Sequence, residues 1–336
     1  MSTQLHVLIT RWRWGEARPL IDQEACMRRR LMIGGVREYP LALALDNPST
    51  NAPPEDVVLK LLTAFPAAAS TPNANGDLPL HLAVRARMPL PILERILADF
   101  VAAMRHRNVA GDLPLHAAVK QDPEQYRCEF EVIEWLVKRY PEAASSVDGE
   151  QELPLHVAAR TGALPATINL LLQQCPAACR EEDMHGDWPL HSAVRTCASF
   201  EMCQLLVEAE PAAARVLCRR TGQLPLHVGI ASGAPIEVLT MLVEEFPGAV
   251  RQRDTVGDLP LRLAMQFGPL ELVERLLLAY PESVQVPDRD GVPPVSLSLT
   301  PLSLSHTPAL NADRCGWRVC ADPLVRAQAG GRARRR

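Results

Sequence analysis

Apolar and polar positions follow one another in a pattern that recurs about every 35 residues along this chain. One phrase reads GDLPLHAAV at residues 111–119, and recognisable copies begin at residues 76, 151, 186, 222 and 257. Two weaker copies, YPLALAL and GVPPVSLSL, begin at residues 39 and 291. Because a fixed spacing in this range is typical of stacked repeat units, the pattern predicts a solenoid rather than separate globular domains.

A second phrase accompanies the first. It is an apolar helical run that ends in an aromatic or small residue and is followed by proline and alanines, as in VVLKLLTAFPAAA at residues 57–69. Proline suits the first turn of a helix but cannot continue one. Each unit is therefore predicted to hold a first helix opened by proline and a second helix closed by proline. Between units, Asn or Asp followed three residues later by Gly predicts a tight turn. In two of these turns, Gln151 replaces the Gly and Arg219 replaces the Asn or Asp.

The repeat divides the chain into three parts. We predict N-terminal capping helices in residues 1–38, around Trp12 to Leu20 and then Gln23 to Arg30, because an end unit must shield an otherwise open apolar face. Residues 39–299 form the predicted repeat solenoid. Residues 300–336 lack helical periodicity and are predicted to be a disordered basic tail.

Over residues 39–299 the chain resembles the ankyrin-repeat family. The resemblance rests on a G-x-x-P-L-H-x-A phrase followed by a leucine-rich second helix, which occurs six times in register. It implies an all-α, ankyrin-like solenoid of helix–turn–helix units with hairpin-like fingers, with about seven helix pairs plus degenerate caps. It also implies a scaffold that binds proteins and generally does no chemistry.

The residue before the repeat proline departs from the family pattern. The family usually has Thr there, and this chain has Leu or Trp, so a helix-capping oxygen is missing. We expect the acidic residue one position earlier to replace it, at about 1 kcal/mol per helix. These residues are Asp77, Asp112, Asp187 and Asp258.

The repeated histidines are His81, His116, His156, His191 and His227, with Arg262 in the next copy. Neighbouring copies should lie about 8–10 Å apart, the packing distance of helices. Zinc needs ligands about 2.0–2.1 Å from one ion, so these side chains cannot share a metal. We predict no metal and no cofactor. Each imidazole is expected to bond the backbone of the adjacent unit as a structural part of the repeat.

Basic residues form two sets. Arg85, Lys120, Arg160 and Arg195 follow the repeat proline by six residues, while Arg107, Arg180 and Arg253 lie in or near the connections. If the family geometry holds, both sets face the concave side, and glutamates such as Glu94 and Glu244 lie on a solvated outer face. The hypothesis is a groove for an acidic partner segment, because complementary charge sets register. The alternative is that arginine is simply common at these positions.

Composition limits the location of the protein. The net charge is −4, and the seven arginines and two aspartates from Thr300 onward contribute +5 of it, which leaves −9 elsewhere. No stretch approaches the ~18 apolar residues that span a membrane, and the N-terminus lacks signal-peptide order. Nine cysteines, without paired CxxC motifs, favour reduced thiols. We predict a cytoplasmic protein, with the nucleus as the alternative that the C-terminal RARRR suggests.

No enzymatic motif is present: the sequence has no G-x-S-x-G, no phosphate loop with G-K-[ST] and no H-E-x-x-H. The predicted function is a non-catalytic protein–protein interaction scaffold that binds its partner through the concave surface and the fingers. It takes no small-molecule substrate and touches no membrane. One alternative is a regulatory component of a larger enzymatic or signalling assembly. The other, less favoured, is nucleic-acid association through the basic surface and tail, which would weaken steeply with salt.

Overall fold

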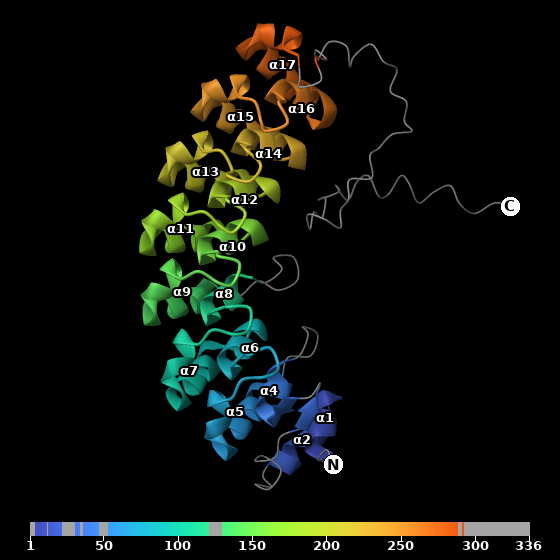
Figure 1. The fold of residues 1–336 in the computed structure, drawn as a ribbon. Helices are drawn as coiled ribbons and strands as arrows, with labels where there is room; N and C mark the ends of the chain where they lie inside the picture. Colours follow the sequence, from blue (N-terminus) through green and yellow to red (C-terminus); the bar gives the residue numbers. More distant parts are fainter. Residues whose placement is uncertain are drawn as a thin grey trace, which may run out of the picture. The chain divides into compact units, whose positions relative to one another are not determined.

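Helix pairs are the building blocks of this protein (Figure 1). The computed structural model describes residues 4–11, 13–21, 31–33, 36–46, 53–120, 130–287 and 291. The first helices are α4 (Pro40–Leu45), α6 (Pro79–Arg85), α8 (Pro114–Val119), α10 (Pro154–Thr161), α12 (Pro189–Arg195), α14 (Pro225–Ser232) and α16 (Pro260–Phe267). The second helices are α5 (Glu55–Ala64), α7 (Leu90–Asp99), α9 (Phe130–Arg139), α11 (Pro165–Gln174), α13 (Phe200–Ala209), α15 (Ile236–Glu245) and α17 (Leu270–Ala279). The predicted all-α solenoid with about seven helix pairs is confirmed.

The two kinds of helix differ in how much of their surface they bury. In α6 every residue from Pro79 to Val84 is buried, because such a helix lies between its own second helix and its neighbours in the row. In α7 only Ile92, Leu93, Ile96 and Leu97 are buried, which is one stripe of an amphipathic helix. The second helices therefore keep an outward face.

A further short helix follows each second helix, and in every described case except η2, which begins at Val101, a proline opens it. Phe65, the residue before it, has φ −148° and ψ 78°, so α5 ends at Ala64 and Pro66 begins a single turn of 3-10 helix. The alanines of the phrase are buried in this turn, as Ala68 and Ala69 are. The expectation that proline merely closes the second helix was therefore incomplete. The turns are η1 (Pro66–Ser70), η2 (Val101–Arg105), η3 (Pro141–Ser145), η4 (Pro176–Arg180), η5 (Pro211–Arg215), η6 (Pro247–Arg251) and η7 (Pro281–Gln285).

The chain divides into two compact units. The first contains residues 1–189 and 208–210, and the second contains residues 190–207 and 211–336. In the first unit, α4, α6, α8 and α10 pack in that order, and α5 packs on α7 and α9 on α11. In the second unit, α14 packs on α16 and α15 on α17. Each unit thus buries its apolar stripes by stacking repeats.

Arginines at the ends of the 3-10 turns connect successive repeats. They stack on the aromatic residue before the next turn, with 4.9–5.5 Å between guanidinium carbon and ring centroid: Arg105 over Tyr140, Arg215 over Phe246, and Arg251 over Tyr280. Such a contact is worth about 0.5–1 kcal/mol at an exposed site. Arg180 meets Glu210 at the equivalent position, and there an ion pair takes the place of the cation–π contact.

Before the first full repeat, two helices pack on it. Helix α1 (Gln4–Thr10) packs on α4, and α2 (Trp14–Ile21) packs on α5. The second overlaps the helix expected around Trp12 to Leu20, while α1 was not predicted. The helix expected over Gln23 to Arg30 lies outside the described residues, as does the predicted tail, residues 300–336. A two-stranded antiparallel hairpin, β1 (Leu31–Ile33) and β2 (Val36–Glu38), was not predicted either.

Candidate protein-interaction surface

The connections between repeats form fingers, and in all but the one before α14 an Asn or Asp side chain holds the described turn. The Asn73 Oδ1 accepts hydrogen bonds from the backbone N–H of Asn75 at 3.0 Å and of Asp77 at 2.9 Å. Asp148, Asp183 and Asp254 hold their turns in the same way. Three residues after Asn73, Gly76 has φ +74°, a left-handed angle that glycine adopts without strain.

The two irregular connections differ from this geometry in different ways. Gln151 adopts φ +58° where the other turns have glycine. The connection before α14 is one residue longer than the others. The N–H of Gly222 donates to Cys218 O at 2.7 Å, four residues back, whereas the N–H of Gly76 donates to Asn73 O, three residues back. The N–H of Cys218 donates to Gln223 O, as Asn73 donates to Asp77. The residue in the Asn position is therefore Cys218, and the assignment of Arg219 to it was wrong.

Neighbouring fingers of the first unit are joined by backbone hydrogen bonds. The N–H of Val109 donates to Asn75 O at 2.9 Å, Gly149 donates to Ala110 O at 2.9 Å, and Met184 donates to Glu150 O at 3.2 Å. These bonds fix the position of each fingertip against the next. The fingers nevertheless carry exposed apolar side chains: Val109 at one tip is 81% exposed, Met184 at another is 55% exposed, and Val147, which directly precedes the turn residue Asp148, is 42% exposed.

The repeated histidines lie inside the stack. The backbone N–H of Leu78 donates to His81 Nδ1 at 3.3 Å, so the proton of the neutral ring must be on Nε2. That nitrogen donates to the carbonyl oxygen of Asp112, in the next finger, at 3.2 Å. The same bonds to the next repeat join His116 to Glu152 O, His156 to Glu181 O and His227 to Gln252 O, at 3.1–3.3 Å. His191 is buried in α12.

Burial controls the charge state of these rings. Desolvation lowers the pKa of His81 to about 4, although the carboxylate of Asp77 acts in the opposite direction. Burial likewise lowers the pKa of His116, His156 and His227. At neutral pH these residues are uncharged hydrogen-bonding bridges between repeats.

The basic residues of the first helices are paired with acids of the connections. Arg85 lies 2.5 Å from Asp77, and Lys120 lies 2.6 Å from Asp112 and 2.9 Å from Asp148. Burial opposes the charge on Lys120, but its hydrogen bonds to both carboxylates outweigh burial and raise its pKa.

A bidentate pair occurs one repeat further on, where Arg160 bonds both oxygens of Glu152 at 3.0 and 2.7 Å. The acids are largely buried, whereas the cations stay partly exposed.

Asp77 therefore does not take over helix capping. One oxygen of Asp77 bonds Arg85, and the other accepts from Asn108 Nδ2 at 2.8 Å. The residue at the helix cap, Leu78, gives its N–H to the histidine ring instead. For Asp77 the expectation of a replacement cap was wrong, because a salt bridge and a finger contact occupy both carboxylate oxygens.

The connection arginines brace consecutive fingers. Arg253 Nη1 donates to Gly257 O at 2.8 Å and to Pro287 O at 2.9 Å. Arg107 makes the same pair of bonds, to Gly111 O at 2.9 Å and to Val147 O. Arg180 bonds Glu210.

The predicted basic residues divide between the two units. Arg85, Lys120 and Arg160 occupy equivalent places on neighbouring first helices of the first unit, whereas Arg195 belongs to the second unit. The sequence interpretation missed the apolar fingertips. An apolar residue inside an otherwise polar turn, as in Asn-Val-Ala-Gly, was the available signal.

Neither a membrane-spanning helix nor a metal centre is formed in the part of the chain that the structure describes. No helix there is long and apolar enough to cross a membrane. No group of three or more His, Cys, Asp and Glu side chains there could hold a metal ion.

Stacked helix pairs with paired fingers define a class of repeat protein, and comparisons name the family. A family model described as ankyrin repeats (3 copies) matches residues 125–216. The crystal structure of the ankyrin repeat domain of Bcl-3, a member of the IkappaB protein family, matches with a TM-score of 0.54 and 24% identity, over 66% of this chain and 93% of that one. No curated protein sequence matches. Residues 125–216 thus match ankyrin repeats, and the fold of the chain resembles an ankyrin-repeat domain; ankyrin repeats generally mediate protein–protein interaction and are typically not enzymes.

Two glycines with similar backbone angles test the packing of the fingers. Gly111 has φ +82°, and a Cβ there would overlap the backbone N of Gly149 in the next finger. Gly233 has φ +75°, with nothing within 4 Å of its Cβ position. We expect Gly233→Ala to cost about 1 kcal/mol from backbone strain alone. Gly111→Ala should cost about 3 kcal/mol or more, because the clash adds to that strain. Melting followed by circular dichroism compares the two, and equal losses would contradict the packing described.

The buried histidines predict a loss of stability in mild acid. Because the pKa of His81 is lower in the folded state than the usual 6.5, the unfolded state binds more protons between about pH 6.5 and 4. The stabilisation is complete above pH 6.5 and is lost as pH falls toward 4, on the order of 3 kcal/mol for this residue. His81→Gln should be less stable at pH 7 and less sensitive to acid. The measurement is the Tm of the native protein and of His81→Gln as a function of pH. Equal slopes for the two proteins would contradict a buried, neutral His81.

Proposed function

We propose that this chain is a non-catalytic scaffold that binds a partner protein along the fingers and first helices of its first unit. The observation that carries the proposal is the set of exposed apolar side chains on three consecutive fingers: Val109 and Met184 at the tips, and Val147 beside the tip of the finger between them. Nothing in the packing of the described repeats uses these side chains to fill a core. Exposed apolar residues grouped on a fixed edge are typical of interaction sites.

The rigidity of the fingers supports the same proposal. Backbone hydrogen bonds and arginine braces hold each tip, so binding a partner would order little of the scaffold. A preorganised surface loses less conformational entropy on association and binds more tightly for the same contacts.

The basic residues of the neighbouring helices give the partner its expected chemistry. Arg160 is paired with the largely buried Glu152, and Arg85 with the buried Asp77 and, at 4.0 Å, with Asp46, yet about two-fifths of each arginine side chain is exposed. A guanidinium has five N–H donors, so donors remain for a further carboxylate. The proposed partner segment combines apolar side chains, which provide the affinity, with acidic ones, which set the register. Arg180 and Lys120 extend the same set of cations. We propose that binding takes place in the cytoplasm or the nucleus.

A pair of charge-introducing variants tests the proposal. Val109→Glu combined with Met184→Glu places carboxylates on two tips, and we expect it to weaken binding of the partner by tenfold or more. Val101→Glu is the matched control, because Val101 is 71% exposed but lies on η2 and not on a finger.

The measurement is quantitative capture from cell extract with mass spectrometry, followed by the Kd of the protein recovered. Loss with the double variant and retention with the control supports the fingertip surface. Equal capture by both would exclude it, and circular dichroism verifies that both variants fold.

A further inference from the structure

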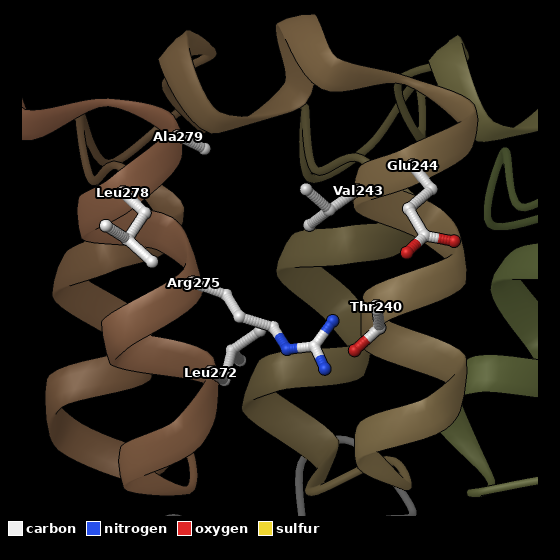
Figure 2. Close-up of a pocket in the computed structure, with 7 residues that line it drawn as sticks. All are labelled: Thr240, Val243, Glu244, Leu272, Arg275, Leu278 and Ala279. Carbon is white, nitrogen blue, oxygen red and sulfur yellow. The ribbon is translucent and has the colours of Figure 1, made fainter.

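A second surface lies on the outward face of the second unit. A groove of about 370 Å³ runs between α15 and α17, lined by Thr240, Val243, Glu244, Leu272, Arg275, Leu278 and Ala279. Figure 2 shows Arg275 reaching from α17 toward α15, with Leu278 on the outer side of α17. Apart from Arg275, Glu244 and Thr240, the lining is aliphatic.

Leu278 is unlike its counterparts in the other repeats. It is 83% exposed, and Leu270 on the same helix is 73% exposed. The equivalent residue of every other second helix is exposed and either polar or small: Thr63, Ala98, Lys138, Gln173, Glu208 and Glu244. Glu244 stays exposed although α17 packs beside α15, so stacking a further repeat does not cover this position. The exposure of Leu278 is therefore not explained by its place near the end of the described repeats.

The same face is acidic. Helices α15 and α17 with η6 and η7 carry six glutamates and two arginines, a balance of −4. One of the arginines, Arg275, is bonded to Glu271 at 3.2 Å. By contrast, α5, α7, α9 and α11 of the first unit, counted with η1 to η4, together carry seven acids and six bases, a balance of −1. The glutamates of the acidic face are Glu237, Glu244, Glu245, Glu271, Glu274 and Glu282.

The chain itself supplies a segment of complementary chemistry. Residues 292–336 follow η7 and begin with VPPVSLSLTPLSLS, in which leucine recurs at 297, 299, 302 and 304. From Thr300 onward the segment carries seven arginines and two aspartates, a balance of +5. An extended chain spans about 3.3 Å per residue, so these 45 residues can reach any part of two neighbouring ten-residue helices. Because the segment is tethered beside the face, its effective concentration there is on the order of millimolar.

We propose that residues 292–336 of this chain dock on the acidic outer face formed by α15, α17 and η7. The leucines of the segment cover Leu278 and the groove, and its arginines pair with the surrounding glutamates. This surface is distinct from the fingertips and does not depend on the proposed partner. A basic, apolar segment of another protein could reach this face only by displacing the chain's own C-terminal segment.

Site-specific photo-crosslinking in the full chain tests the proposal. Leu278 is replaced by the photoreactive amino acid benzoylphenylalanine, and the matched control carries it at the equivalent exposed position of α9, Lys138. We expect ultraviolet light to join the peptide containing position 278 to a peptide from residues 292–336, in a product of monomer mass. The control should give at least fivefold less of this product. A yield no higher than that of the control overturns the proposal, as does a crosslink to a second copy of the chain.

Charge reversal separates docking from mere proximity of a tethered segment. Glu244→Lys combined with Glu274→Lys should lower the crosslink yield at position 278 several-fold, and Glu94→Lys on α7 should leave it unchanged. Raising NaCl to about 0.5 M should act like the double variant, because screening there is effective beyond a few ångströms. A yield that neither change lowers shows that charge does not hold the segment, and it overturns the proposal.

Discussion

Every structural feature of this protein follows from one constraint: a single helix pair cannot bury its own apolar stripe. A first helix such as α6 is apolar on nearly all sides, and it is buried only because other helices lie on both sides of it. The hydrophobic contribution to stability therefore resides largely between repeats and not inside them. What distinguishes this chain is the number of polar contacts that fix how one repeat meets the next.

These contacts act at three depths. In the interior, a neutral histidine links the start of one first helix to the carbonyl of the next finger. At the fingers, backbone hydrogen bonds and the Arg107 brace join adjacent turns. Near the second helices, an arginine lies on the aromatic or acidic residue before the next 3-10 turn. Polar groups thus mainly fix the position of each repeat against the next. The exposed apolar side chains of Val109 and Leu278 have no such role in the packing of the repeats.

The features that recur with the repeat could be predicted from the sequence. The contacts between residues that the fold brings together could not. Repeat period, helix pairs and turn glycines all follow from local chemistry, as the proline of α6 and the glycine of its finger illustrate. The salt bridge between Asp77 and Arg85 joins residues eight apart, and its acid looked like a helix cap because capping was the nearest local role. The spacing of the turn motif did not predict that Cys218 occupies the Asn position. This connection has one more residue before its glycine, so counting back three residues from Gly222 gives Arg219. The 3-10 turns could have been predicted from the sequence, because a proline followed by alanines is suited to the start of a helix as well as to the end of the preceding one.

Native-state hydrogen exchange tests most directly whether the repeats depend on their neighbours. The account predicts that amides of α16 and α17 exchange through partial openings that leave α8 and α10, inside the first unit, protected at least tenfold more strongly. The N–H of Val109, bonded across two fingers, should be as protected as the helices of its repeat. Exchange of all helices at one common free energy, together with an unprotected Val109, would contradict a structure held together between its repeats.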